Sequence, residues 1–179
     1  MDMAKSRIEI QNLADRLLQE AGIEPCFKPM VSRLVASQGL QVVPALNLAT
    51  GEFSSLKLNG VEQNGVFSRM NCIVSVNASR DEKEQRLATV YQVAFFVLHK
   101  DLEGQYESHL TASALHREDD DAMRLACALL MNRNLFLDKF KRAMKGIPNR
   151  VAVCKNLSAQ FGVPEFSVEQ RAKELDLPI

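Results

Sequence analysis

The three histidines of the chain, His99, His109 and His116, are the first candidates for metal chemistry. Imidazole and carboxylate groups bind zinc when several converge on one point. His109 and His116 lie near Glu107 and Glu118, but their spacing matches no recognised zinc motif. One interpretation is an alternative metal site built from these residues. We favour the other, in which His109 and His116 are solvated and His99 binds free carbonyls at a helix end.

Two further patterns could carry chemistry. The acidic run Asp119–Asp121 could hold Mg²⁺ or Ca²⁺, but it lacks the alternation and glycine of a calcium-binding loop. Acidic residues also favour the first turn of a helix, which is the interpretation we prefer. Cys154 and the serines lack a nucleophile elbow, and the sequence has no glycine-rich phosphate loop. These motifs therefore predict no cofactor.

Composition limits the class of protein. The chain has 179 residues, 46% of them hydrophobic, and 22 basic residues balance 22 acidic ones. This length predicts one core, and zero net charge gives no overall field for binding DNA phosphates. The four cysteines contain no Cys-x-x-Cys pair, and no apolar segment has the length of a membrane span. We expect a cytoplasmic protein.

Helical and strand patterns alternate in the first half of the chain. Apolar spacing predicts helices over Ala4–Glu20 and Pro29–Ser37. Leu40–Leu46 has a strand pattern, and Pro44 favours an edge strand or the end of a strand. Short strands are also predicted, with turns at Thr50-Gly51 and Asn59-Gly60, over Phe53–Leu58, Gly65–Arg69 and Cys72–Val76.

Helices dominate the second half. Ser79-x-x-Glu82 has the form of a capping box and predicts a long, mostly buried helix up to Leu98. The polar segment Lys100–Glu118 is predicted to be a loop or hairpin. Four more helices are expected over Ala122–Met131, Leu135–Lys145, Val151–Phe161 and Ser167–Leu175. The order of elements predicts an α+β fold, mostly helical, with a small sheet of three or four strands.

The long helix and its neighbours resemble the ImmA/IrrE family of zinc metallopeptidases. Family members have a strand ending in Val-Asn, then a helix with Arg-x-Thr-x-x-His-Glu-x-x-His, and a later helix that starts with a glutamate ligand. Here the corresponding segments are Ile73–Asn77, Arg86–His99 and Asp121–Asn132. The apolar framework matches over about Gly65–Met131. The resemblance implies a zincin-like metallopeptidase fold.

The zinc motif itself is replaced. Tyr91 stands for the first histidine, Gln92 for the glutamate, Phe95 for the second histidine and Asp121 for the third ligand. A phenol titrates near pH 10, an amide is no general base, and a phenyl ring binds no metal. We therefore expect no zinc and no catalytic residue. An active peptidase with a non-standard metal site is an alternative.

The resemblance implies a regulator that binds a protein partner. Family members act on helix-turn-helix repressors of phage, mobile elements or stress responses, and a peptidase fold holds its target beside an edge strand. We expect a repressor or a toxin–antitoxin protein as the partner. Either Cys72–Val76 or Gly65–Arg69 is the expected edge. The expected binding residues are Cys72, Val74, Val76, Tyr91, Gln92 and His99.

The end of the chain offers a second hypothesis. Residues 147–179 resemble a helix-turn-helix extension to the domain 1–146. Lys155, Arg171 and Lys173 could contact DNA phosphates. Acidic residues dilute this charge, so we favour a packing or dimerisation unit. The sequence leaves the oligomeric state open.

Overall fold

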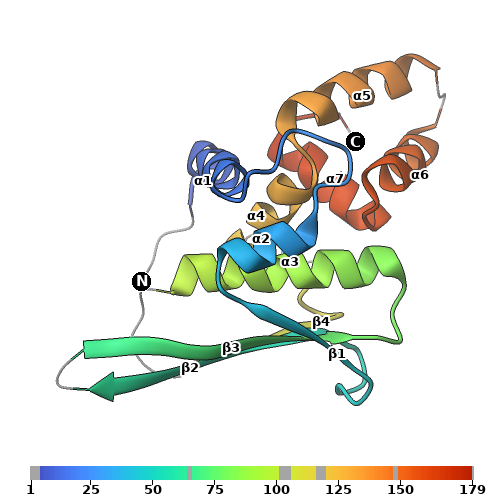
Figure 1. The fold of residues 1–179 in the computed structure, drawn as a ribbon. Helices are drawn as coiled ribbons and strands as arrows, with labels where there is room; N and C mark the ends of the chain where they lie inside the picture. The colour runs from blue at the N-terminus through green and yellow to red at the C-terminus, as the bar shows by residue number, and fades with distance from the viewer. Residues whose placement is uncertain (1–4, 64–65, 101–105, 116–119, 147–148, 179) are drawn as a thin grey trace.

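The computed structural model describes residues 5–63, 66–100, 106–115, 120–146 and 149–178. It has two layers, a mixed sheet and a set of helices that covers one face of it (Figure 1). Within these ranges the elements are α1 (Arg7–Glu20), α2 (Val31–Ser37), β1 (Gln41–Ala45), β2 (Glu52–Gln63), β3 (Val66–Asn77), α3 (Glu82–His99), β4 (Tyr106–Thr111), α4 (Asp121–Leu130), α5 (Arg133–Gly146), α6 (Arg150–Phe161) and α7 (Glu165–Glu174). The predicted α+β class is confirmed.

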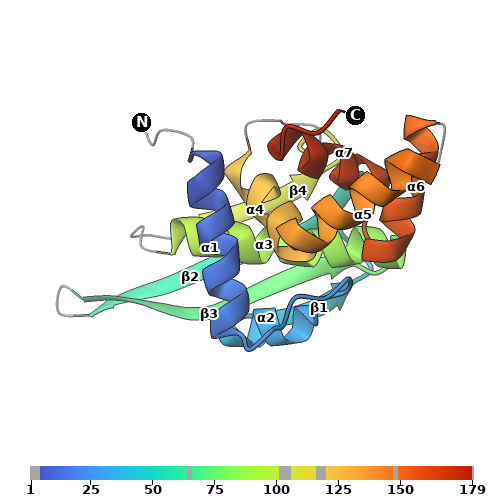
Figure 2. The same ribbon diagram turned by 90° about the horizontal axis from the view of Figure 1, so that it is seen from above.

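The sheet has the order β1-β3-β2-β4. β1 runs parallel to β3, while β2 is antiparallel to both β3 and β4. Pro44 therefore lies in an edge strand, as predicted, because an interior strand would need the missing N–H. The distal part of the β2–β3 hairpin extends beyond the helical layer (Figure 2).

Two predictions about the strands are wrong. Asn59-Gly60 is not a turn, since β2 continues through both residues to Gln63 with an irregularity between Lys57 and Asn59. The segments predicted at Gly65–Arg69 and Cys72–Val76 belong to one strand, β3, over its described residues. Cross-strand pairing overrides the local preference of Asn-Gly for a hairpin turn.

The polar segment after α3 also differs from its prediction. It contains the strand β4, whose Leu110 pairs with Ser54 and is fully buried. Leu110 alternates with exposed Glu107 and His109, and this alternation is the period-two pattern of a half-buried strand. Residues 101–105 and 116–119, including His116, Glu118 and Asp119, lie outside the described residues.

The helix α3 starts two residues later than the predicted capping box implies. Asp81 is its N-cap, and the Asp81 carboxylate accepts a hydrogen bond from the Glu84 N–H at 2.9 Å. Ser79 is not the cap, because its hydroxyl donates to Asn77 Oδ1 at 2.6 Å. The middle of α3 is buried on all sides between the sheet and the other helices, as its apolar sequence predicts.

The C-terminal helices share the core of the rest of the chain. Val163, Val168 and Ala172 are fully buried in the same cluster as Ile10 and Leu125. The expected boundary at residue 146 therefore does not separate two hydrophobic cores. Gly162, at φ 64°, ends α6 and allows the tight connection to α7. None of the helices in the described ranges is long and apolar enough to cross a membrane.

Candidate functional site

Gln92 lies at the centre of the candidate site and is completely buried. Its amide nitrogen donates to the Ser54 carbonyl oxygen at 3.2 Å and to the Ser54 hydroxyl oxygen at 3.0 Å. The Ser54 hydroxyl in turn donates to the Ala88 carbonyl. The Gln92 amide therefore joins α3 to β2 through the buried face of the sheet. Its oxygen Oε1 is buried and has no hydrogen-bond partner among the described residues.

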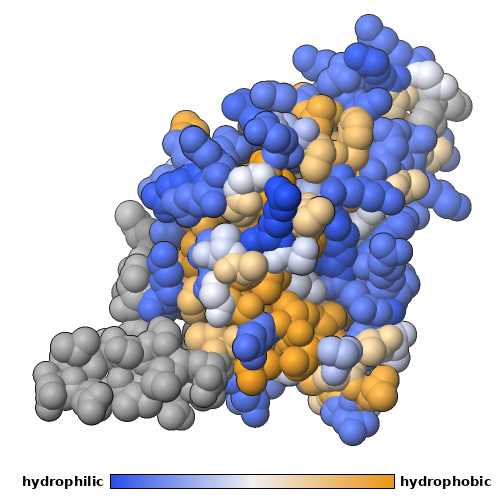
Figure 3. Space-filling model, viewed as in Figure 1, coloured by the Kyte–Doolittle hydropathy of each residue, from blue (hydrophilic) through white to orange (hydrophobic). Residues whose placement is uncertain are grey.

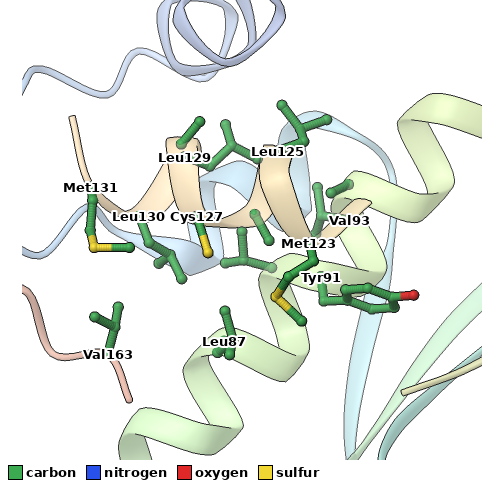
Figure 4. Packing of buried hydrophobic residues seen from close by; sticks show 14 of the residues in the cluster. Leu87, Tyr91, Val93, Met123, Leu125, Cys127, Leu129, Leu130, Met131 and Val163 are labelled. Carbon is green, nitrogen blue, oxygen red and sulfur yellow. The ribbon is translucent and has the colours of Figure 1, made fainter. Parts of the chain in front are cut away.

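Tyr91 extends from α3 toward the start of α4. Its ring lies beside Met123, with the phenolic oxygen pointing away from the apolar cluster (Figure 4). This hydroxyl donates to Asp120 Oδ2 at 3.0 Å, and Tyr91 is 6% exposed. The other oxygen of Asp120 caps α4 by accepting from the N–H groups of Ala122 and Met123. The Asp120 carboxylate is thus shared between a helix cap and the phenol.

Asp121 points elsewhere. Its Oδ2 accepts from the Lys5 N–H at 2.8 Å, and its Oδ1 pairs with Arg124 at 2.6 Å. The family resemblance implies that Asp121 stands at the position of a third zinc ligand, but Asp120 is the residue that contacts Tyr91. The two carboxylates differ by one position at a helix N-terminus, where successive side chains point in directions about 100° apart.

Phe95 and His99 form a stacked pair in the last turns of α3. Their ring centroids are 4.1 Å apart with an interplanar angle of 22°. His99 Nδ1 lies 2.8 Å from the Phe95 carbonyl oxygen, so the imidazole caps the end of the helix. The helix-end interpretation of His99 is confirmed. The stacked partner that the structure shows for Phe95 is His99, one helical turn further along α3.

His109 lies on β4, the strand that follows α3 in the chain. Its Nδ1 is 2.6 Å from Glu52 Oε1 and its Nε2 is 3.4 Å from Glu107 Oε1. Lys57 pairs with the same Glu107 at 3.5 Å. These residues form a polar network along β2 and β4. The described residues contain no group of three or more His, Cys, Asp or Glu side chains that could hold a metal ion.

Comparison with known proteins gives the family. Residues 53–173 match the family model described as the IrrE N-terminal-like domain, a peptidase family. The match includes α3, the sheet strands β2 to β4 and the C-terminal helices. The chain belongs to this family. A search of curated proteins finds no match.

The zinc site of this peptidase family does not fit the residues present. In an HExxH helix two imidazoles face the metal and the glutamate activates its water. Here the phenol of Tyr91 binds Asp120, and the buried amide of Gln92 binds the sheet. Phe95 supplies only a ring. The three side chains make packing and hydrogen-bonding contacts where the family would need ligands and a base.

The predicted edge strand of this IrrE-like domain is wrong for Cys72–Val76. Val74 pairs with Val42 of β1 on one side and with Leu56 of β2 on the other. Cys72, Val74 and Val76 are at most 8% exposed. An interior strand offers no unpaired backbone groups, so these three residues and the fully buried Gln92 cannot contact a partner directly. The strands at the ends of the described sheet are β1 and β4.

The DNA-binding prediction fails at Arg171. This guanidinium is 1% exposed and donates to the Met131 carbonyl and to Gln11 Oε1. Burial lowers the pKa of Arg171 to about 10. Lys155 is exposed on α6. The second helix of the pair packs against α4 with its arginine inward, so the structure assigns Arg171 to the core and not to a phosphate contact.

Sequence reasoning missed Asp120 and Ser54. The sequence contains a signal for Asp120, because aspartate is a favoured N-cap residue immediately before a helix. Ser54 gave no signal, since its role depends on the register between β2 and α3. Such tertiary contacts cannot be predicted from local spacing alone.

We expect Asp120→Ala to destabilise the protein by about 2 kcal/mol. The substitution removes the α4 cap, worth about 1 kcal/mol, and leaves the buried Tyr91 hydroxyl without this acceptor. Urea unfolding followed by circular dichroism measures the change. Asp138→Ala removes an exposed carboxylate of α5 that pairs with Arg142 and serves as the matched control, with an effect within about 0.5 kcal/mol.

Proposed function

We propose that this chain is a non-hydrolytic member of its peptidase family, which regulates by binding a protein partner. The partner class implied by the family resemblance is a helix-turn-helix repressor or a toxin–antitoxin protein. One observation carries the loss of hydrolysis: the Tyr91 hydroxyl is hydrogen-bonded to Asp120 while the adjacent Gln92 amide is bound to Ser54. The chemistry of these groups supports binding without cleavage.

Peptide hydrolysis by this fold needs a Lewis acid and a base on the same helix turn. Zinc polarises the scissile carbonyl and lowers the pKa of its bound water, and a glutamate takes the proton. Neither the phenol of Tyr91 nor the ring of Phe95 replaces an imidazole at neutral pH. A side-chain amide accepts no proton at Gln92. The described sheet has two end strands, β1 and β4, beside which a partner segment can bind.

The first test is metal content. We expect protein purified without a histidine tag to contain zinc far below one equivalent, measured by plasma mass spectrometry after dialysis. The double variant Tyr91→His/Phe95→His is the positive control, because two histidines one turn apart bind zinc weakly. We expect it to take up measurable zinc. Stoichiometric zinc in the wild-type protein would overturn the proposal.

The second test asks what happens to a partner. Chemical crosslinking in an extract of the source cells, followed by mass spectrometry, should return a specific protein whose chain is intact. Incubation of that partner with the purified protein should leave its mass unchanged, with or without a chelator. Cleavage that a chelator abolishes would show a working peptidase. The absence of any specific partner would count against the binding role.

A further inference from the structure

The edge strand β1 combines two features that soluble proteins normally keep apart. β1 is an end strand of the described sheet, so one side of its backbone is unpaired. It also carries exposed apolar side chains: Val42 is 40% exposed, Val43 39%, and Leu46, which follows the strand, 81%. The space-filling view shows an apolar region at this edge of the molecule (Figure 3). An exposed apolar edge is a template for pairing with another chain.

The other end strand is protected. β4 presents Glu107 and His109, which link to Glu52 and Lys57 of the neighbouring strand through charged contacts. Charged side chains on an edge strand oppose the addition of another strand. Of the two end strands, β1 is therefore the more favourable surface for pairing.

The direction of the β1 backbone groups follows from one hydrogen bond. The Ala45 carbonyl accepts from the Ala78 N–H at 3.0 Å, so Ala45 turns its backbone toward β3. Backbone groups alternate along a strand, which turns Val42 and Pro44 away from β3. The free side of β1 therefore offers the N–H and carbonyl of Val42 and the carbonyl of Pro44. Pro44 has no N–H to offer.

A second copy of this chain is a poor occupant of the edge. Two copies related by a two-fold axis would pair their β1 strands antiparallel. If Val42 of one copy lies opposite Val42 of the other, Pro44 of one copy lies opposite Leu40 of the other. The Leu40 N–H already donates to the Val35 carbonyl, so the Pro44 carbonyl gains no donor. If Val42 lies opposite Pro44, the Val42 carbonyl gains no hydrogen-bond donor, because Pro44 has no N–H. Either register leaves a backbone acceptor of the new interface unpaired, which costs about 1–3 kcal/mol each time.

A different polypeptide has no such deficit. An extended segment with its own N–H groups can donate to both carbonyls and accept from the Val42 N–H. Val42 and Val43 lie on opposite faces of the sheet, so both flank the added strand with apolar surface. We propose that the free edge of β1 binds an extended, proline-free segment of a partner protein, which adds a fifth strand to the sheet.

This inference deepens the proposed function and rests on it, because it names the surface with which a non-hydrolytic regulator would hold its partner. The test uses the full-length protein and a phage-displayed library of random linear peptides as the probe. Enriched peptides are synthesised, and their affinity is measured by fluorescence anisotropy. We expect Val43→Lys to weaken their binding at least tenfold. Val151→Lys, at an exposed valine of α6 that is distant from β1 in the chain, is the control and should stay within twofold.

Two measurements distinguish the addition of a strand from nonspecific hydrophobic binding. Hydrogen exchange of the complex should show new protection at the Val42 N–H, and N-methylation of alternate peptide amides should abolish binding. Protection at β4 alone, equal binding by Val43→Lys, or failure to enrich any linear peptide would overturn the proposal. So would a wild-type dimer that Val43→Lys dissociates. Zinc-dependent cleavage would sink the proposed function and leave the protection at Val42 unaffected, so the two failures are distinguishable.

Discussion

Gln92→Glu should destabilise the protein strongly, and increasingly so as the pH rises. The side chain at this position is completely buried against the Ser54 carbonyl and hydroxyl. A carboxylate here would lose its hydration and face a carbonyl oxygen at the place where the amide donates. Burial of this kind raises the pKa of a carboxyl group by up to several units. The variant therefore restores the family's glutamate at a position that disfavours its charged form.

The pH dependence has a definite sign. The unfolded glutamate titrates near pH 4.3, and the folded one is shifted upward. Below about pH 4 both states are neutral, and the variant should be close to wild type. Between the two pKa values only the unfolded state loses its proton. The free energy of unfolding should thus fall by about 1.4 kcal/mol per pH unit relative to wild type.

Urea unfolding of both proteins between pH 4 and pH 8 measures this difference. Gln19→Glu, at an exposed position of α1, is the control and should change the free energy of unfolding by only a few tenths of a kcal/mol at every pH. A loss below about 0.5 kcal/mol at pH 7.5 for Gln92→Glu would contradict the buried position of the amide. It would also reopen the question of a glutamate base at this site.

The sequence predicted the helices well because their signals are local. α1 ends near Gly22, whose φ is 63°, and α6 and α7 are joined through Gly162, as the spacing of glycine and apolar residues indicated. The long strands were predicted in pieces. Asn59-Gly60 is a strong turn signal, and only the pairing of β2 with β3 shows that it was overridden.

The candidate site also has features that local sequence predicts and features that depend on tertiary contacts. The replacement of the zinc motif was visible from residue types at Tyr91, Gln92 and Phe95. The side chains that hold these residues come from distant parts of the chain, namely Ser54 on β2 and Asp120 before α4. Which of Asp120 and Asp121 contacts Tyr91 depends on the residue at which α4 begins, because a shift of one residue turns the side chain by about 100°. Sequence spacing does not determine that rotation, because the helix boundary itself is uncertain by a residue.

The same geometry explains why Asp121 is unavailable to a metal. Arg124 lies between two carboxylates and is 8% exposed. It forms a bidentate pair with Glu174 at 2.9 and 2.7 Å, a contact with Asp121 at 2.6 Å, and a bond to the Lys5 carbonyl at 2.7 Å. The hydrogen bonding of Arg124 to the Glu174 carboxylate is the main reason that the pKa of Arg124 is raised. This arginine ties α4 to α7 and to the start of α1.

We expect Arg124→Met to cost about 3–5 kcal/mol, because it leaves two partly buried carboxylates without their cation. For a chain of this length that loss corresponds to a fall in Tm of roughly 10 °C, measured by differential scanning calorimetry. Arg142→Met removes an exposed pair with Asp138 at 3.0 Å and should change Tm by no more than about 2 °C. The double variant Arg124→Met/Glu174→Met should regain part of the loss, since it removes one orphaned charge. A single variant as stable as wild type would show that α7 is held without the Arg124–Glu174 pair, and that Asp121 could be released toward Tyr91 at little cost.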